Sequence, residues 1–114
     1  MTTHAASQLR FKAQVFHASS AFDRLEILEF LSDGERCVCE IVPYLNLIQP
    51  VVSRHLKILR DTGIIRCRKD RTKRMYSLVD ARISNVVDAL TSEVVGMLQK
   101  EVIEQTTCTP AEEE

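Results

Sequence analysis

Two cysteines, Cys37 and Cys39, stand two residues apart in the stretch E-R-C-V-C-E, residues 35–40. Thiolates are the ligands that soft metal ions prefer, while a thiol pair can also be oxidised or simply buried. If both residues belonged to one regular helix, their side chains would point about 200° apart, because each residue turns by about 100°. One thiol would then be exposed, which disfavours simple burial. An ion shared by both would require the first turn of that helix to bend or unwind.

Length and composition indicate one small globular domain over residues 1–114, with 45% hydrophobic and 27% charged residues. No stretch approaches the roughly 18 apolar residues that a membrane helix needs. Residues 1–10 lack the apolar segment of a secretory signal. We therefore expect a cytoplasmic protein whose four cysteines stay reduced, which favours metal binding, redox sensing or burial over structural disulfides.

Positive charge is concentrated in one part of the chain, although the formal net charge is −1. Residues 49–74 contain nine basic and two acidic residues, a local charge of +7, so the rest of the chain carries −8. This distribution favours an anionic partner at one surface, although a solvated charged loop is the alternative. The basic residues are Arg54, Lys57, Arg60, Arg66, Arg68, Lys69, Arg71, Lys73 and Arg74.

Hydrophobic periodicity predicts a mainly α-helical chain with one β-hairpin, an α+β fold. Ser20 is the expected N-cap of the second helix, Asp33-Gly34 its stop, and Gly63 the end of the fourth. The predicted helices span 8–18, 21–32, 37–44, 49–62 and 81–103, with a break near 45–47 and hairpin strands at 64–68 and 75–79.

The predicted helix 49–62 has two distinct faces. Val52, Leu56 and Leu59 recur at helical spacing and should pack inward, while polar residues occupy another face and Pro50 fits the first turn. A short helix, a tight turn, a polar-faced helix and a basic hairpin together form a winged helix-turn-helix. Such a helix fits the DNA major groove, and a basic hairpin can hold phosphates or enter the minor groove. The predicted DNA-binding residues are Gln49, Pro50, Ser53, Arg54, His55, Lys57, Arg60, Arg68, Lys69, Arg71, Lys73 and Arg74.

Two residues in this region allow more than one role. His55 is expected to contact DNA or to pack locally rather than to bind a metal, and Tyr76 is expected to fill the inner face of the hairpin. The final helix has an apolar stripe larger than a small core requires, and we expect it to form a homodimer interface. The stripe consists of Ile83, Val86, Val87, Leu90, Val94 and Met97.

The segment S-R-H-L-K-I-L-R-D-T-G-I-I, residues 53–65, resembles the ArsR/SmtB family of winged-helix repressors. Gln49-Pro50 before it, Tyr76-Ser77-Leu78 after it and residues 21–28 extend this resemblance. The family implies a homodimer that binds a palindromic operator in double-stranded DNA and leaves it when a metal or metalloid binds. It implies neither enzymatic activity nor an organic cofactor.

The segment C-V-C-E-I, residues 37–41, is similar to the C-V-C-D-L motif of arsenic- and cadmium-responsive members. This resemblance implies that Cys37 and Cys39 bind As(III) or Sb(III), with Cd(II), Pb(II) or Bi(III) as alternatives. Val42 holds the place of a third cysteine found in arsenic repressors, and the N-terminal arm supplies none. A third sulfur must therefore come from elsewhere or from a small thiol, and Cys108 in the T-T-C-T-P tail is the candidate.

Other potential ligands fit less well. Cys67 is expected to be buried filler in its strand, and a zinc site in the last helix is not expected because Leu90 replaces the histidine that should accompany Asp88. His4 and His17 are candidate accessory ligands. A repressor switched by oxidation of the thiols stays open as an alternative. A thiol reductase or a structural zinc module is disfavoured because the spacing supplies neither a catalytic base nor four ligands.

Overall fold

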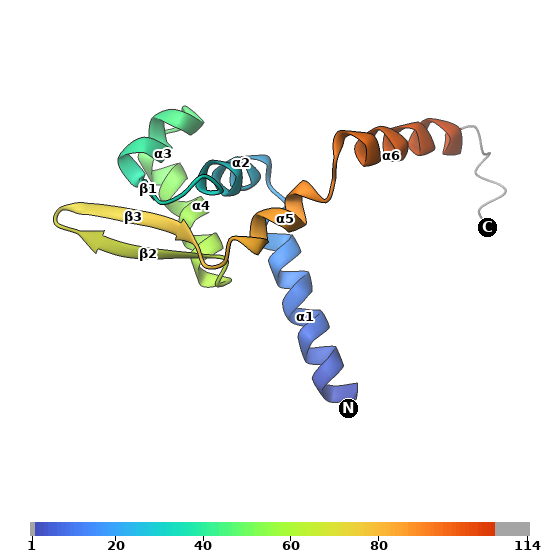
Figure 1. Cartoon of the computed structure of the whole chain (residues 1–114), viewed down its shortest axis with the longest axis horizontal. Helices are drawn as coiled ribbons and strands as arrows, with labels where there is room; N and C mark the ends of the chain where they lie inside the picture. Colours follow the sequence, from blue (N-terminus) through green and yellow to red (C-terminus); the bar gives the residue numbers. More distant parts are fainter. Residues whose placement is uncertain (1, 107–114) are drawn as a thin grey trace. The chain divides into compact units, whose positions relative to one another are not determined.

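The computed structural model describes residues 2–106, and for residues 2–4 the backbone only. It is mainly α-helical with a small antiparallel sheet (Figure 1), as the sequence predicts. The elements are α1 (Thr2–Ala18), α2 (Phe22–Leu31), β1 (Arg36–Cys37), α3 (Val38–Leu45), α4 (Gln49–Asp61), β2 (Ile65–Asp70), β3 (Lys73–Leu78), α5 (Arg82–Asp88) and α6 (Ser92–Gln105).

The core lies among α2, α3, α4 and the sheet. The predicted inward face of α4 is confirmed, because Val52, Leu56 and Leu59 are at most 1% exposed. Ile27 of α2 and Ile41 of α3 are completely buried. Burying a side chain of this size contributes about 1.5–3 kcal/mol, so these contacts fix how the outer face of α4 is presented.

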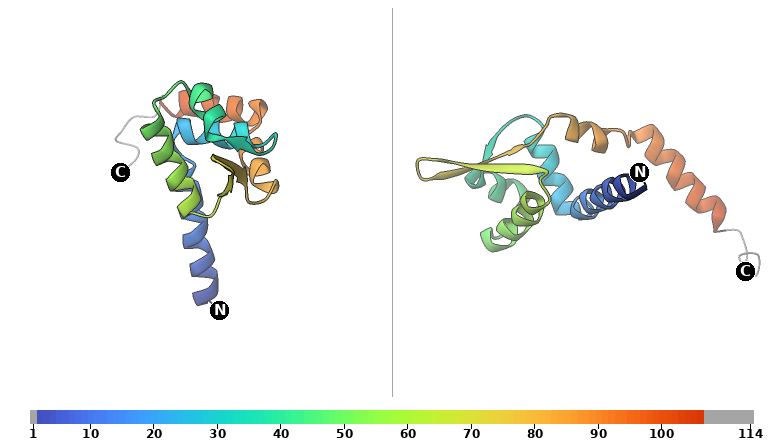
Figure 2. Two further views of the ribbon diagram at one scale, coloured as in Figure 1. Left: turned by 90° about the vertical axis from the view of Figure 1, so that its left-hand side faces the viewer. Right: turned by 90° about the horizontal axis from the view of Figure 1, so that it is seen from below.

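The sheet has the strand order β1-β3-β2. The hairpin pairs Ile65 with Leu78 and Asp70 with Lys73, which leaves a two-residue loop at its tip. The third strand, β1, pairs Arg36 with Tyr76 and Cys37 with Met75, and it was not predicted from the sequence. Figure 2 shows the hairpin extending beyond the helices as a wing.

Two helix boundaries were predicted from single residues, and one of the two predictions is wrong. Gly63, with φ of 86°, follows α4 as predicted, and the amide of Ile64 donates to the carbonyl of Leu59 at 3.2 Å. Ser20 was expected to cap the start of the second helix. Its hydroxyl instead donates to the carbonyl of His17 at 2.7 Å, at the end of α1, and Ala21 takes the N-cap position of α2.

The predicted single helix over 81–103 is wrong, because the structure forms α5 and α6 there. Thr91 is extended and its side chain accepts a hydrogen bond from the amide of Val94 at 3.3 Å, so it caps a new helix. Contacts divide the chain into two compact units between Ser84 and Asn85. Among the described residues, no helix is long and apolar enough to cross a membrane.

Candidate DNA-binding surface and thiol site

The outer face of α4 and the wing meet at one surface hollow. Gln49, Ser53, Lys57 and Arg60 of α4 and Arg74 of β3 line this hollow, so five residues predicted to bind DNA lie together. Its remaining walls are Val38, between the two cysteines, and Tyr76. The hollow therefore presents an amide, hydroxyls and three cationic side chains beside the thiol segment.

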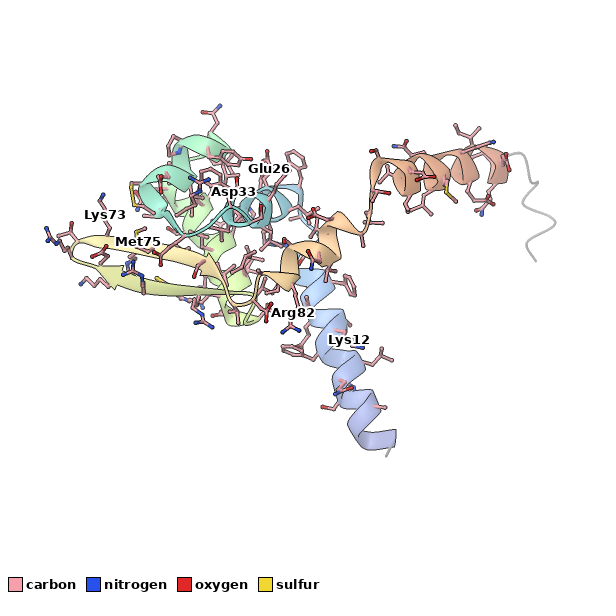
Figure 3. The ribbon with its side chains drawn as sticks, in the orientation of Figure 1. Lys12, Glu26, Asp33, Lys73, Met75 and Arg82 are labelled. Atoms are coloured by element: carbon pink, nitrogen blue, oxygen red, sulfur yellow. A yellow bond between two sulfur atoms is a disulfide. The ribbon has the colours of Figure 1, made fainter. Side chains whose placement is uncertain are left out.

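The other predicted DNA-binding residues divide between α4 and the wing. Pro50 and Arg54 are exposed on α4, and Lys69, Arg71 and Lys73 are exposed around the hairpin tip. Figure 3 labels Lys73 there, among other nitrogen-bearing side chains. Arg71 has φ of 62°, in the left-handed region that favours glycine, so the loop places a charged side chain where glycine would be easier to accommodate.

His55 lies on another side of α4 and takes the packing role that the sequence left open. Its Nδ1 is 3.2 Å from an Arg24 guanidinium nitrogen and its Nε2 is 3.5 Å from an Asp23 carboxylate oxygen. Only 16% of its side chain is exposed. These contacts join α4 to α2, and they do not bring His55 to the hollow.

Two cationic residues of the predicted surface are already paired with carboxylates. Lys57 donates to Asp61 at 2.8 Å, one turn further along α4, and this hydrogen bond lowers the pKa of Asp61. Arg68 of β2 donates to both carboxylate oxygens of Glu35 at 2.7 and 2.8 Å, which raises the pKa of Arg68 and lowers that of Glu35. A two-bond arginine–carboxylate contact has a defined orientation as well as a charge.

Tyr76 occupies the inner face of the sheet, as predicted, and is 6% exposed. It lies opposite Cys67 in the hairpin register. Burial raises the pKa of Tyr76, and a hydrogen bond with Cys67 raises it further. Tyr76 also forms part of the wall of the hollow.

Cys37 and Cys39 are joined by a disulfide in the structure, with their Cα atoms 5.0 Å apart. The expectation that the described cysteines are all reduced is therefore wrong for this pair. Cys37 is 4% exposed and Cys39 is exposed, so the two side chains differ in access as predicted.

The predicted helix around both cysteines is also wrong at its start. Cys37 ends β1 with extended backbone angles and is the N-cap of α3. Its sulfur accepts from the amide of Cys39 at 3.0 Å, and its own amide donates to Glu40 at 2.9 Å, a reciprocal capping box. Because Cys37 lies outside the helix, the two sulfurs meet while α3 is intact. The premise of a regular helix through both cysteines is therefore wrong, and unwinding of α3 by a shared ion no longer follows from their spacing.

Pro43 lies inside α3. Proline has no backbone N–H, so the helical hydrogen bond to the carbonyl of Cys39, four residues earlier, is missing. The turn that carries Cys39 is consequently held by one backbone hydrogen bond fewer than a regular helix provides.

The described residues offer two sulfurs at this site but no larger ligand cluster. No group of three or more His, Cys, Asp or Glu side chains suited to a metal ion occurs among them. Cys67 is half-buried on β2 and His17 is exposed on α1. Cys108 lies outside the described residues, and so does the His4 side chain.

A protein-family model described as "Bacterial regulatory protein, arsR family" matches residues 23–66, from α2 to the start of the wing. The uncharacterized HTH-type transcriptional regulator MJ1325 of Methanocaldococcus jannaschii is 42% identical over 72 residues, 62% of this chain and 81% of that protein. The chain belongs to the ArsR family. The family and fold are those of DNA-binding transcriptional regulators, which are not enzymes.

Other similar proteins share this architecture or part of the sequence. An arsenical resistance operon repressor of Staphylococcus xylosus is 44% identical over 55 residues, 48% of this chain and 53% of the repressor. The match thus spans about half the length of that relative. The homodimeric winged helix-turn-helix DNA-binding domain of Mb0332 from Mycobacterium bovis superposes with a TM-score of 0.73 at 28% identity, covering 80% of this chain and 87% of the domain.

Proposed function

We propose that this ArsR-family protein is a cytoplasmic repressor that binds a palindromic operator as a homodimer. In this proposal it leaves the DNA when As(III), Sb(III) or a similar soft ion binds Cys37 and Cys39. The observation that carries the DNA-binding part is the hollow where the outer face of α4 meets the wing.

The position of the hollow suits a DNA backbone. If α4 enters the major groove and the wing reaches the neighbouring minor groove, the sugar-phosphate strand between the two grooves must cross between them. Lys57, Arg60 and Arg74 line the hollow at that crossing. Cationic side chains around a phosphate strand give affinity and fix the register of the helix on the duplex.

The homodimer is supported by apolar side chains that this chain leaves exposed. Met97, Val102 and Ile103 of α6 are 64%, 61% and 68% exposed, and no residue of α6 is buried. Phe11 and Phe16 of α1 are 54% and 62% exposed. Such clusters typically mark an interface. A second copy would also supply the second α4 that a palindromic operator requires.

The soft-ion inducer is supported by the chemistry of the donor set and by the staphylococcal relative named as an arsenical repressor. The backbone brings the sulfurs of Cys37 and Cys39 together, so once the disulfide is reduced both thiolates can bind one ion. Thiolate ligands select soft ions over hard ones. As(III) and Sb(III) favour three sulfurs, and Cys108 or a small thiol would supply the third.

The inducer is tested with labelled DNA from upstream of the protein's own gene. Arsenite, added under reducing conditions, should release the wild-type protein, and Cys37→Ser and Cys39→Ser should bind without release. Serine is a favoured N-cap residue, so Cys37→Ser keeps a capping oxygen while it removes the sulfur. Cys67→Ser, on β2, is the control and should respond normally. Normal release in both single variants of the pair would exclude this sensor.

Oxidation of the same thiols is a second candidate signal, and the disulfide between Cys37 and Cys39 favours it. A peroxide would take two electrons and two protons from the thiols, leaving the disulfide, water and the alcohol or a second water derived from the peroxide. Release by peroxide alone, reversed by a thiol reductant, would support this signal. Release by arsenite with reductant present throughout would support the metalloid instead.

A further inference from the structure

The segment before α3 belongs to the thiol site and to the wing at the same time. Cys37 caps α3, yet it also pairs with Met75 in β3, and Met75 pairs on its other side with Arg68 of β2. Cys37, Met75 and Arg68 therefore form one row across the three strands. Figure 3 shows Met75 on the wing near the start of α3.

Glu35, just before β1, forms an ion pair with Arg68 of β2. It precedes Cys37 by two residues, and its carboxylate accepts two hydrogen bonds from Arg68, at 2.7 and 2.8 Å, across 33 positions of sequence. Because Arg68 is one of the predicted phosphate-binding cations, this pairing occupies the Nε–Nη2 edge of its guanidinium, one edge that could bind a phosphate in two hydrogen bonds. The carboxylate also places a negative charge beside the wing.

Arg36 anchors the same segment to the body of the domain. Its guanidinium lies 4.2 Å from the ring centroid of Phe30, and its Nε donates to the Phe30 carbonyl at 3.3 Å. The Phe30 ring in turn stacks on Tyr44 of α3, with centroids 3.9 Å apart. Arg36 lies between Cys37 and Glu35, so its contacts set the position from which Glu35 reaches Arg68.

We propose that Glu35 and Arg68 are the positioning residues that carry the state of Cys37 and Cys39 to the wing. This inference rests on the proposed function. When the two sulfurs are joined, by a bond or by a shared ion, Glu35 holds Arg68 and withholds it from DNA. When the sulfurs are separate, the pair opens and Arg68 binds a phosphate. This coupling removes one cation from each wing.

The strength of the pair limits the size of this effect. The Arg68 and Glu35 side chains are 56% and 31% exposed, and an exposed ion pair shifts an equilibrium by at most about fivefold. The pair therefore contributes up to about fivefold per protomer to release, and on the order of 25-fold for two protomers. It is one part of the response and not the whole of it.

The test compares operator affinity of the full chain with free thiols and with thiols bridged by phenylarsine oxide. This probe forms two As–S bonds and loses its oxygen as water with the two thiol protons. The coupling ratio is the dissociation constant of the bridged form divided by that of the free form. Glu35→Gln should lower the ratio by tightening the bridged form, whereas Arg68→Gln should lower it by weakening the free form. In the double variant, Glu35→Gln should add nothing to Arg68→Gln.

Simple repulsion between Glu35 and DNA gives a different result. Glu35→Gln would then tighten both forms equally and would do so in the Arg68→Gln background as well, which would overturn the proposal. Arg66→Gln is the matched control: Arg66 is exposed on the same strand and face, and its loss should weaken both forms alike. Wild-type protein that fails to bind DNA, or to be released, would instead refute the proposed function.

A measurement without DNA tests the same contact. The Nε–H of Arg68 should exchange slowly with solvent and show a carboxylate-bonded shift by NMR in the bridged protein. It should lose both features when the thiols are free. An Arg68 signal that is identical in the two forms would overturn the proposal even if DNA release is normal.

Discussion

Neutralising the cations that line the hollow should change how DNA binding depends on salt. Arg60 of α4 and Arg74 of β3 line the hollow from its two sides, and both are exposed. If the DNA backbone crosses the hollow, each binds a phosphate and releases counterions on association. Arg60→Gln and Arg74→Gln remove these charges and keep side chains of similar polarity.

The magnitude follows from the number of phosphates lost. Each contact contributes about 0.9 to the slope of log K against log salt, so a homodimer that loses one contact per protomer should have a slope smaller by about 1.8. At 0.1 M salt, one contact corresponds to roughly eightfold in affinity, or about 1.2 kcal/mol, and two correspond to roughly 60-fold. The double variant should lose about twice as much slope as either single variant.

Fluorescence anisotropy of a labelled operator between 50 and 300 mM KCl measures this slope. Lys100→Gln removes an equivalent charge from α6, which contributes no residue to the hollow, and should leave the slope unchanged. Circular dichroism should show all three single variants folded, because none of these side chains is buried. If the slope of log K against log salt is the same for Arg60→Gln and Arg74→Gln as for the wild type, the phosphate assignment is refuted, even if affinity falls.

Three further predictions concern stability and the thiol turn. Gly63→Ala should lower the free energy of unfolding by about 1 kcal/mol in urea denaturation, because φ of 86° is unfavourable with a Cβ; a neutral result would contradict the strain argument. Pro43→Ala should restore a hydrogen bond to the Cys39 carbonyl, raise the thermal midpoint and require more arsenite for half-release, whereas an unchanged midpoint would show that the missing bond has no cost. The Arg82 side chain, with help from its amide, holds the pKa of Asp80 well below its usual range, so this carboxylate contributes stability above its ordinary pKa and loses it as pH falls through the depressed value. NMR titration should place the Asp80 midpoint below the ordinary range and Arg82→Gln should raise it, and equal midpoints would exclude the pairing.

Helix α4 was predictable because its hydrophobic pattern involves only residues near one another in the sequence. Apolar residues at helical spacing define the buried face of α4, and this fixes the outer face by geometry. Gly63 ends the helix through its own backbone freedom, which the sequence also reveals. The hairpin follows in the same way from two β-rich runs and a short polar loop. These features required no knowledge of distant contacts.

The errors arise where a distant or competing contact decides the structure. Cys37 was assigned to a helix, but pairing with Met75 draws it into a strand. The apolar stripe over residues 81–103 fits one helix, yet the cap formed by Thr91 starts a second one. In each case hydrophobic periodicity continues through a boundary that is set by a single polar or backbone contact.

Contacts between distant residues were missed for the same reason. Glu35 and Arg68 are 33 positions apart, and no local pattern relates them. His55 likewise contacts Arg24 across 31 positions, so its role on α4 was left open between DNA and packing. Pro43 is different, because its effect on the Cys39 carbonyl follows from sequence once the helix is assigned.

The position of Cys37 changes how a signal at the thiols can reach DNA. Had both cysteines been within one helix, binding an ion would have required work against several backbone hydrogen bonds of α3. The Cys37 sulfur instead forms the cap of α3, and its backbone forms the edge of the wing sheet. Oxidation or coordination changes the charge and the available electron pairs of the sulfur that accepts the Cys39 amide, and a helix N-terminus is sensitive to such charge. A change at this one atom therefore occurs next to both the start of α3 and the strand that pairs with the wing.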